Sequence, residues 1–283
     1  MQLSTASCGE SFKRKIFLVV FQGMLAVHFQ SNFKGYPLHN EPFFKSLLLF
    51  SMLLDAITVA VVGGIICLDR ILLQVMLSRP VVVGPIIGFI LGDPYTGLIS
   101  GALIELLWID RLPVGVYVPP NDSIVAVLAV AGSIVTGREL GHLPRELIAL
   151  SILLFIPFGI LGQKMEVSIM RSNDILSRKA VEDAKTGDIK SISRKHIFGL
   201  FKTFFFTAVF IFVFLILGVT ILKYVFPLIP QRGLTALSYT YLFLPLLGVA
   251  VALNTINLRG TIPVFCGAFL IVTVVFEFLI GIF

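Results

Sequence analysis

Two long stretches of this chain contain no charged side chain. Residues 203–222 form a run of twenty between Lys202 and Lys223, and residues 233–258 form a run of twenty-six. About 20 apolar residues in a helix span the hydrocarbon core of a bilayer, and a helix satisfies its backbone hydrogen bonds internally. Both stretches are therefore predicted to be transmembrane helices.

Composition extends this conclusion to the whole chain of 283 residues, of which 57% are hydrophobic and 13% charged. The lipid bilayer is the predicted main solvent. The net charge of +6 comes from basic residues in connecting segments, so topology explains it better than nucleic acid as a primary ligand. The three cysteines and four histidines have no metal-ligand spacing, and neither a metal nor a cofactor is predicted.

Between residues 80 and 137 the apolar runs are too short to cross a bilayer comfortably. Residues 80–92, 94–104 and 123–137 contain thirteen, eleven and fifteen residues. Gly-Asp-Pro and Pro-Pro-Asn-Asp sequences, which break helices, separate them. The predicted fold class is an all-α integral membrane protein of multiple transmembrane helices, with broken or re-entrant short helices between residues 80 and 125.

Irregular backbone at membrane depth is stable only where protein buries it or where it lines a cavity. Several breaks in an otherwise apolar chain therefore favour a substrate site within residues 80–125. The alternative is that the breaks are ordinary tight turns between short helices at the surface.

Residues 163–202 form the most hydrophilic segment, with nine Lys/Arg against five Asp/Glu. The positive-inside rule predicts that this basic loop lies in the cytoplasm. Residues 176–184 can form an amphipathic helix that ends in residues 185–188, so we expect a compact helical loop. Forty residues are too few for a separate enzyme domain.

Residues 1–51 differ from the rest of the chain and carry no functional prediction. A basic triplet followed by an apolar stretch at residues 16–29 is typical of a signal peptide or a short anchor. The alternative is an over-extended gene model in which Met52 is the initiator. Residues 52–283 are the predicted membrane domain in either case.

An ordered set of residues extends over about forty-five positions: Arg79-Pro80, Gly92-Asp93, Thr96-Gly97, Gly101, Glu105, Gly115 and Pro120-Asn121-Asp122. Its order and spacing resemble the IIC membrane subunit of the mannose/fructose/sorbose-type bacterial phosphotransferase system. Weaker similarity continues through the basic segment to Asn254. One departure lies in residues 108–117, which add charge and bulk, so specificity for mannose or glucose does not follow.

The resemblance implies a multi-pass subunit of the bacterial plasma membrane that translocates a sugar and is not itself an enzyme. It further implies a IID membrane partner, cytoplasmic IIA and IIB phosphocarrier proteins, and a homo-oligomer of IIC–IID pairs. Two alternatives are an uncoupled sugar facilitator or secondary carrier, and a non-transporting membrane scaffold or sensor.

Glu105 is a candidate binding residue because an ionised carboxylate in an apolar helix is costly unless it faces a cavity or has a partner. It would accept hydrogen bonds from sugar hydroxyls, or it would pair with Arg79 or Arg111 as a structural lock. Asn121 and Asp122 precede an apolar helix, where they would either cap the helix or bind vicinal hydroxyls.

Three further candidates for substrate binding are Asp110, Gln74 and Asn254. Asp110 is adjacent to Arg111 and close to Trp108, which favours an ion pair at the membrane interface. Gln74 and Asn254 are uncharged polar residues within apolar runs, where hydrogen bonding between helices is the main alternative to sugar binding.

Overall fold

The computed structural model describes residues 42–72, 74–111, 117–256, 267 and 271, and every regular element in this part is helical. The elements are α2 (Pro42–Leu68), α3 (Pro80–Ile90), α4 (Pro94–Leu107), α5 (Asp122–Leu140), α6 (Arg145–Thr186), α7 (Ile189–Val225), the 3-10 helix η2 (Phe226–Leu228) and α8 (Gln231–Ile256). Five of them, α2, α5, α6, α7 and α8, are long and apolar enough to cross a membrane. The all-α, multi-pass membrane fold is thereby confirmed.

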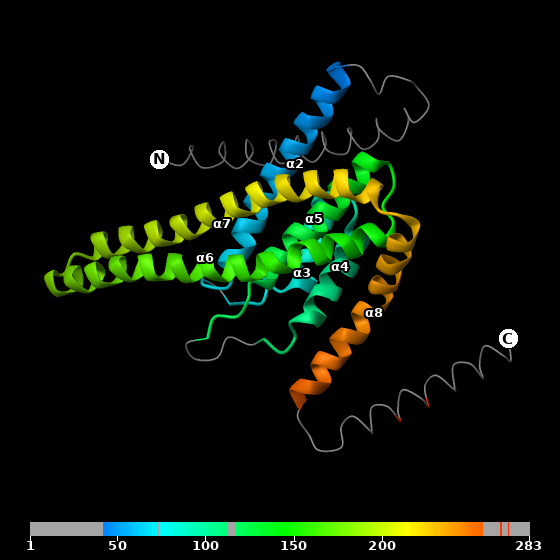
Figure 1. The fold of residues 1–283 in the computed structure, drawn as a ribbon. Coiled ribbons are helices and arrows are strands. Elements are labelled where there is room, and N and C mark those ends of the chain that lie inside the picture. Colours follow the sequence, from blue (N-terminus) through cyan, green and yellow to red (C-terminus); the bar gives the residue numbers. More distant parts are fainter. Residues whose placement is uncertain (1–41, 73, 112–116, 257–266, 268–270, 272–283) are drawn as a thin grey trace, which may run out of the picture.

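The centre of the fold is α5, which contacts α2, α3, α4, α6 and α7 (Figure 1). Every side chain from Ser123 to Gly137 is buried. Small residues allow this close packing: Ser151 Oγ of α6 donates to the Ala129 carbonyl at 2.8 Å, and the Phe155 ring packs on Gly132. With 19 residues, α5 is about 28 Å long, so its two ends lie near opposite faces of the hydrocarbon core.

The short helices α3 and α4 form a tightly packed hairpin beside α5. Gly84 and Gly88 on α3 face Gly97 and Gly101 on α4, and a Cβ atom on Gly84 would lie 2.2 Å from the Gly97 carbonyl oxygen. Two opposed small-xxx-small motifs thus allow the two backbones to touch. The hairpin turns at Gly92, where φ is +80°. The short, interrupted helices expected for residues 80–125 are confirmed.

Residues 163–202 do not form a compact loop. They continue α6 and α7 without a break, and Figure 1 shows the two helices running side by side beyond the rest of the molecule. We call residues 163–202 the arm. Gly187, with φ of 75°, ends α6, and the Asp188 side chain accepts from Ser191 N to start α7. The helix end expected in residues 185–188 is found there, but the helix preceding it is the end of α6.

The end of the predicted membrane domain, residues 257–283, lies outside the described residues apart from two isolated positions, and so do residues 1–41. The described part ends in α8, which packs on α4 and α6. Only 11% of the residues in the most apolar stretch of α8 are buried. Most of the surface of α8 is therefore available to lipid or to another membrane-embedded chain.

Candidate functional site

The loop between α2 and α3 is organised around Asp69, whose side chain is only 4% exposed. Its carboxylate accepts from Val75 N at 3.0 Å, from Ser78 N at 3.2 Å and from Ser78 Oγ at 3.3 Å. Burial pushes the pKa of Asp69 up, but these hydrogen bonds outweigh burial and hold the pKa below its ordinary value. Gln74 and Met76 have positive φ angles of 54° and 66°. Such backbone is costly for these residues, and the surrounding hydrogen bonds stabilise it.

This loop places Arg70 between two carboxylates from different helices. Arg70 Nη1 lies 2.7 Å from Asp122 Oδ1 on α5, and Arg70 Nε lies 3.8 Å from Glu166 Oε1 on α6. The exposed fractions of the three side chains are 17%, 16% and 11%. A guanidinium in this position compensates two largely buried charges and joins the end of α2 to α5 and α6.

Asn121 connects the Glu166 carboxylate to the start of α5. Its Oδ1 caps the helix by accepting from Ile124 N at 2.9 Å, and its Nδ2 donates to Glu166 Oε1 at 2.7 Å. The capping role considered from the sequence is therefore present, together with a second contact. A hydrogen bond of 2.5 Å from Ser123 Oγ to the Ser78 carbonyl fastens the loop to α5.

A second ion pair lies at the other end of the loop. Arg79 Nη1 is 3.1 Å from Glu105 Oε1, and Val81 N donates to Glu105 Oε2 at 3.5 Å. Of its two expected partners, Glu105 pairs with Arg79. Arg111 instead pairs with Asp110, with Arg111 Nε 3.4 Å from Asp110 Oδ1. Ser78 precedes Arg79 and Ser123 follows Asp122, so the hydrogen bond from Ser123 to the Ser78 carbonyl places the two ion pairs in one polar region.

We call this region the polar cluster. It consists of Arg70, Arg79, Glu105, Asn121, Asp122 and Glu166. All six lie at the end of α5 from which the arm projects. Glu105, Asn121 and Asp122, three of the residues predicted from the sequence, are thus brought together.

The other three predicted residues lie elsewhere or are not fully described. Asp110 is in the turn after α4, next to its partner Arg111. Gln74 is exposed in the α2–α3 loop instead of lying within a helix. The side chain of Asn254, in the last part of α8, lies outside the described residues.

Sequence analysis missed Arg70, Glu166 and Asp69. Asp69 and Arg70 directly follow the uncharged end of α2, and Glu166 is the first acid after the apolar part of α6. Glu166 was counted among the charges of the hydrophilic segment, where its partners are not visible. A charged residue immediately after an apolar run was the available signal.

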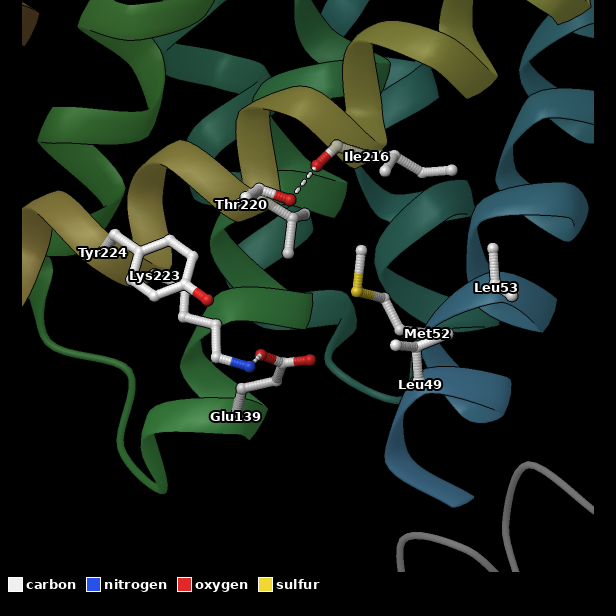
Figure 2. Close-up of a pocket in the computed structure, with 9 residues that line it drawn as sticks. Leu49, Met52, Leu53, Glu139, Ile216, Thr220, Lys223 and Tyr224 are labelled. Atoms are coloured by element: carbon white, nitrogen blue, oxygen red, sulfur yellow. Dashed lines mark hydrogen bonds and ion pairs between the residues drawn. The ribbon is translucent and has the colours of Figure 1, made fainter. Parts of the chain in front are cut away.

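The opposite end of α5 contains a hollow of about 260 Å³ between α2, α5 and α7. Figure 2 shows the Lys223 amino group pointing at the Glu139 carboxylate, and the two groups are 2.5 Å apart. The remaining walls are mostly aliphatic, including Leu49, Met52 and Ile216. This hollow is lined by few polar groups, whereas the polar cluster consists of them.

The chemistry of the polar cluster suits hydroxyl recognition. Three carboxylates accept hydrogen bonds, two guanidinium groups donate them, and the Asn121 amide does both. Within the described residues, no group of three or more His, Cys, Asp or Glu side chains could hold a metal ion. The groups of the cluster can donate hydrogen bonds to, and accept them from, the hydroxyl groups of a polar solute.

Comparison with known families gives one match over most of the chain. The family model described as "PTS system sorbose-specific iic component" matches residues 53–282. The mannose-specific EIIC component of the phosphotransferase system of Escherichia coli K12 is 24% identical over 213 residues, or 75% of this chain and 77% of that protein. N-acetylgalactosamine permease IIC component 1 of the same strain is 30% identical over 142 residues, covering 50% of each chain.

The matched part covers 64% of the putative N-acetylgalactosamine permease IIC component 2 of Escherichia coli K12, which is less than two thirds of that protein. A solved structure described as "Structure of membrane protein" superposes with a TM-score of 0.62 at 22% identity. That superposition covers 81% of this chain and 91% of the other. It shows that the two chains share a fold.

Proposed function

Because the chain belongs to the phosphotransferase-system IIC components of the sorbose and mannose type, we propose that its polar cluster binds a sugar during translocation. The bound sugar is released at the cytoplasmic face of a bacterial plasma membrane. The chain is the permease subunit and contributes binding and movement, without catalysing phosphoryl transfer.

One observation carries this proposal: three carboxylates from three different helices converge on two arginines and one asparagine. Charged side chains that are largely buried within a membrane protein are costly and often mark substrate pathways. In the structure Arg70 and Arg79 satisfy the carboxylates. A sugar hydroxyl would donate to Asp122 or Glu105 while an arginine donates to a second sugar oxygen.

The proposed direction of release rests on the arm. Its nine Lys/Arg against five Asp/Glu favour the cytoplasmic side, and the polar cluster lies at the same end of the membrane-embedded helices. A sugar in the cluster would therefore be close to the compartment in which soluble phosphocarriers act.

The proposed partners follow from family membership. A IID membrane subunit would complete the sugar site, cytoplasmic IIA and IIB proteins would carry the phosphoryl group, and IIC–IID pairs would assemble further. Gln74, Asp110 and Asn254 stay predictions as additional sugar contacts.

The test compares two matched aspartates, each in an ion pair with an arginine. Asp122 pairs with Arg70 in the polar cluster at 2.7 Å, and Asp55 pairs with Arg138 at the opposite end of α5 at 2.9 Å. Cells without a mannose-type system would express this chain with IIA, IIB and IID, and phosphoenolpyruvate-dependent uptake of labelled hexoses would be measured.

We expect Asp122→Asn to lower uptake at least about tenfold, because a hydrogen bond to a charged group contributes about 1.5–3 kcal/mol. Asp55→Asn should keep uptake within about twofold, at equal amounts of membrane-inserted protein. Equal losses in both variants would reject the polar cluster as the sugar site. Uptake that persists without IIA and IIB would indicate an uncoupled carrier, and partner binding without any uptake would indicate a scaffold.

A further inference from the structure

A second, smaller hollow lies between α6 and α7 at the base of the arm. Its volume is about 230 Å³, and its lining consists of Met165, Ser168, Ile169, Ser172, Lys202 and Phe206. We call it the arm groove. It is separate from the polar cluster, since none of the six cluster residues lines it.

The arm groove lies where both helices leave the apolar part of the membrane. On α7, Lys202 is the last charge before the uncharged residues 203–222. On α6, the uncharged residues 147–162 end shortly before Met165. The groove is therefore at the depth of the lipid headgroups, on the side from which the arm projects.

One part of the groove is polar and cationic. The Lys202 ammonium group donates to Ser172 Oγ across the gap between the helices, and Ser168 adds an exposed hydroxyl one turn away. None of the lining residues is acidic. A compact positive charge beside two hydroxyl groups matches a phosphate oxygen in charge and in hydrogen-bonding capacity.

The rest of the lining is apolar and continues toward the membrane centre. Ile169 is buried, and the Phe206 side chain is 48% exposed, one turn beyond Lys202 in the direction of the uncharged run. A ligand that fills both parts has a phosphate at one end and a hydrocarbon chain at the other. Glycerophospholipids have this construction.

We propose that the arm groove binds one anionic phospholipid, with the headgroup phosphate at Lys202, Ser172 and Ser168 and an acyl chain along Phe206 and Met165. Charge selects the anionic class, because the arm has an excess of basic residues that repels the cationic headgroup of a zwitterionic lipid. This site is independent of the proposed sugar site, and either can fail without the other.

The test measures lipid binding to the purified, detergent-solubilised full chain by native mass spectrometry. Phosphatidylglycerol is the probe, phosphatidylcholine is the zwitterionic comparison, and inorganic phosphate tests the headgroup chemistry alone. The variants are Lys202→Ala, Lys202→Arg and Ser172→Ala. The matched control is Lys190→Ala, an exposed lysine of the same helix about 18 Å away.

We expect one phosphatidylglycerol adduct that forms at lower concentration than any phosphatidylcholine adduct. Lys202→Ala should weaken it about fivefold, since one basic residue near an anionic lipid surface contributes about that factor. Lys202→Arg should retain it, Ser172→Ala should weaken it less, and Lys190→Ala should leave it unchanged.

Three results would overturn the proposal. Equal losses in the Lys202→Ala and Lys190→Ala variants would show a general effect of positive charge. Binding of inorganic phosphate with the same dependence on Lys202 would show a site for free anions. A protein-sized adduct that disappears in Lys202→Ala would show that a second chain occupies the groove.

Discussion

The two ends of α5 both hold ion pairs, but the pairs differ in their surroundings. At the arm end, Arg70, Asp122 and Glu166 have exposed fractions of 17%, 16% and 11%, and the fully buried Asn121 joins them. At the far end, Arg138 and Asp55 are 27% and 26% exposed, and Lys223 reaches 48%. The first set is a connected network that joins the α2–α3 loop, α5 and α6. In the second set, one ion pair joins α5 to α2 and another joins α5 to α7, and their cations are more exposed.

This difference separates two uses of charge within a membrane protein. A partly exposed ion pair near a membrane face connects two helices and remains partly hydrated, so its net contribution to stability is small. A network that shares one arginine between two buried carboxylates contains groups that need a partner at all times. Such groups can exchange an internal partner for a ligand, which makes the arm end the better candidate for substrate binding.

The largest expected effect is that of Arg70→Ala, which would leave Asp122 and Glu166 without their shared cation. The free energy of unfolding should fall by about 3 kcal/mol, as it does when one partner of a buried ion pair is removed. Sugar uptake should be lost as well. Denaturant unfolding in detergent and uptake by cells expressing the variant measure the two effects.

Arg70→Lys is the matched variant, because lysine keeps the positive charge but lacks the separate guanidinium nitrogens that face Asp122 and Glu166. It should show an intermediate loss of stability. If Arg70→Ala unfolded with the same free energy as the wild type, the carboxylates at the arm end would not depend on Arg70. The proposed difference between the two ends of α5 would then be rejected.

Asp69→Asn should have the next largest effect, because Asp69 positions the loop that holds both Arg70 and Arg79. An amide replaces one acceptor oxygen by a donor, so part of the bonding to Val75 and Ser78 is lost. We expect a cost of about 1–2 kcal/mol and uptake lowered about fivefold, with a raised KM for the sugar. Ser78→Ala, which removes only the hydroxyl contact, should cost less; an equal cost would argue against a positioning role for Asp69.

At the far end, Lys223→Ala should cost about 1 kcal/mol or less, since the Lys223 side chain is nearly half exposed. Uptake per inserted molecule should stay unchanged. Thermal unfolding and uptake measured on the same membranes would test this. A tenfold loss of uptake would place the far end on the substrate route.

The smallest effect is expected for Asp110→Asn. Asp110 and Arg111 are neighbours in the chain with exposed fractions of 28% and 51%, so their pairing adds little to stability. Uptake within about twofold of the wild type would restrict the site to the polar cluster. A loss comparable with that of Asp122→Asn would extend the site to the turn after α4.

Much of the local structure could be predicted from the sequence because the signals are local. Prolines and polar caps determine where helices begin, and α3, α4 and α5 start at Pro80, Pro94 and Asp122, directly after the breaks found in the sequence. Asn121 preceding an apolar run indicated a cap, and the structure contains that cap.

Contacts between distant segments could not be predicted in this way. Arg70 is 52 residues from Asp122 in the chain, and Asn121 is 45 residues from Glu166. Glycines spaced four residues apart, such as Gly84 with Gly88, indicate that a helix packs closely, but they do not indicate which helix is its partner. The positive charge of the arm is evident from the sequence, but its continuity with α6 is not, because the change from apolar to hydrophilic residues after Gly162 does not show whether the helix ends there.

The unbroken course of α6 has a mechanical consequence. Glu166 and the tip of the arm at Thr186 belong to one helix and are separated by about 30 Å. This helix is continuous, and its contacts with α5 hold it in place at the end near Glu166. A tilt of about 5° displaces the tip by roughly 2.6 Å and applies a torque at the hydrogen bond between Glu166 and Asn121. A force on the arm is thereby transmitted to the polar cluster along one unbroken helix.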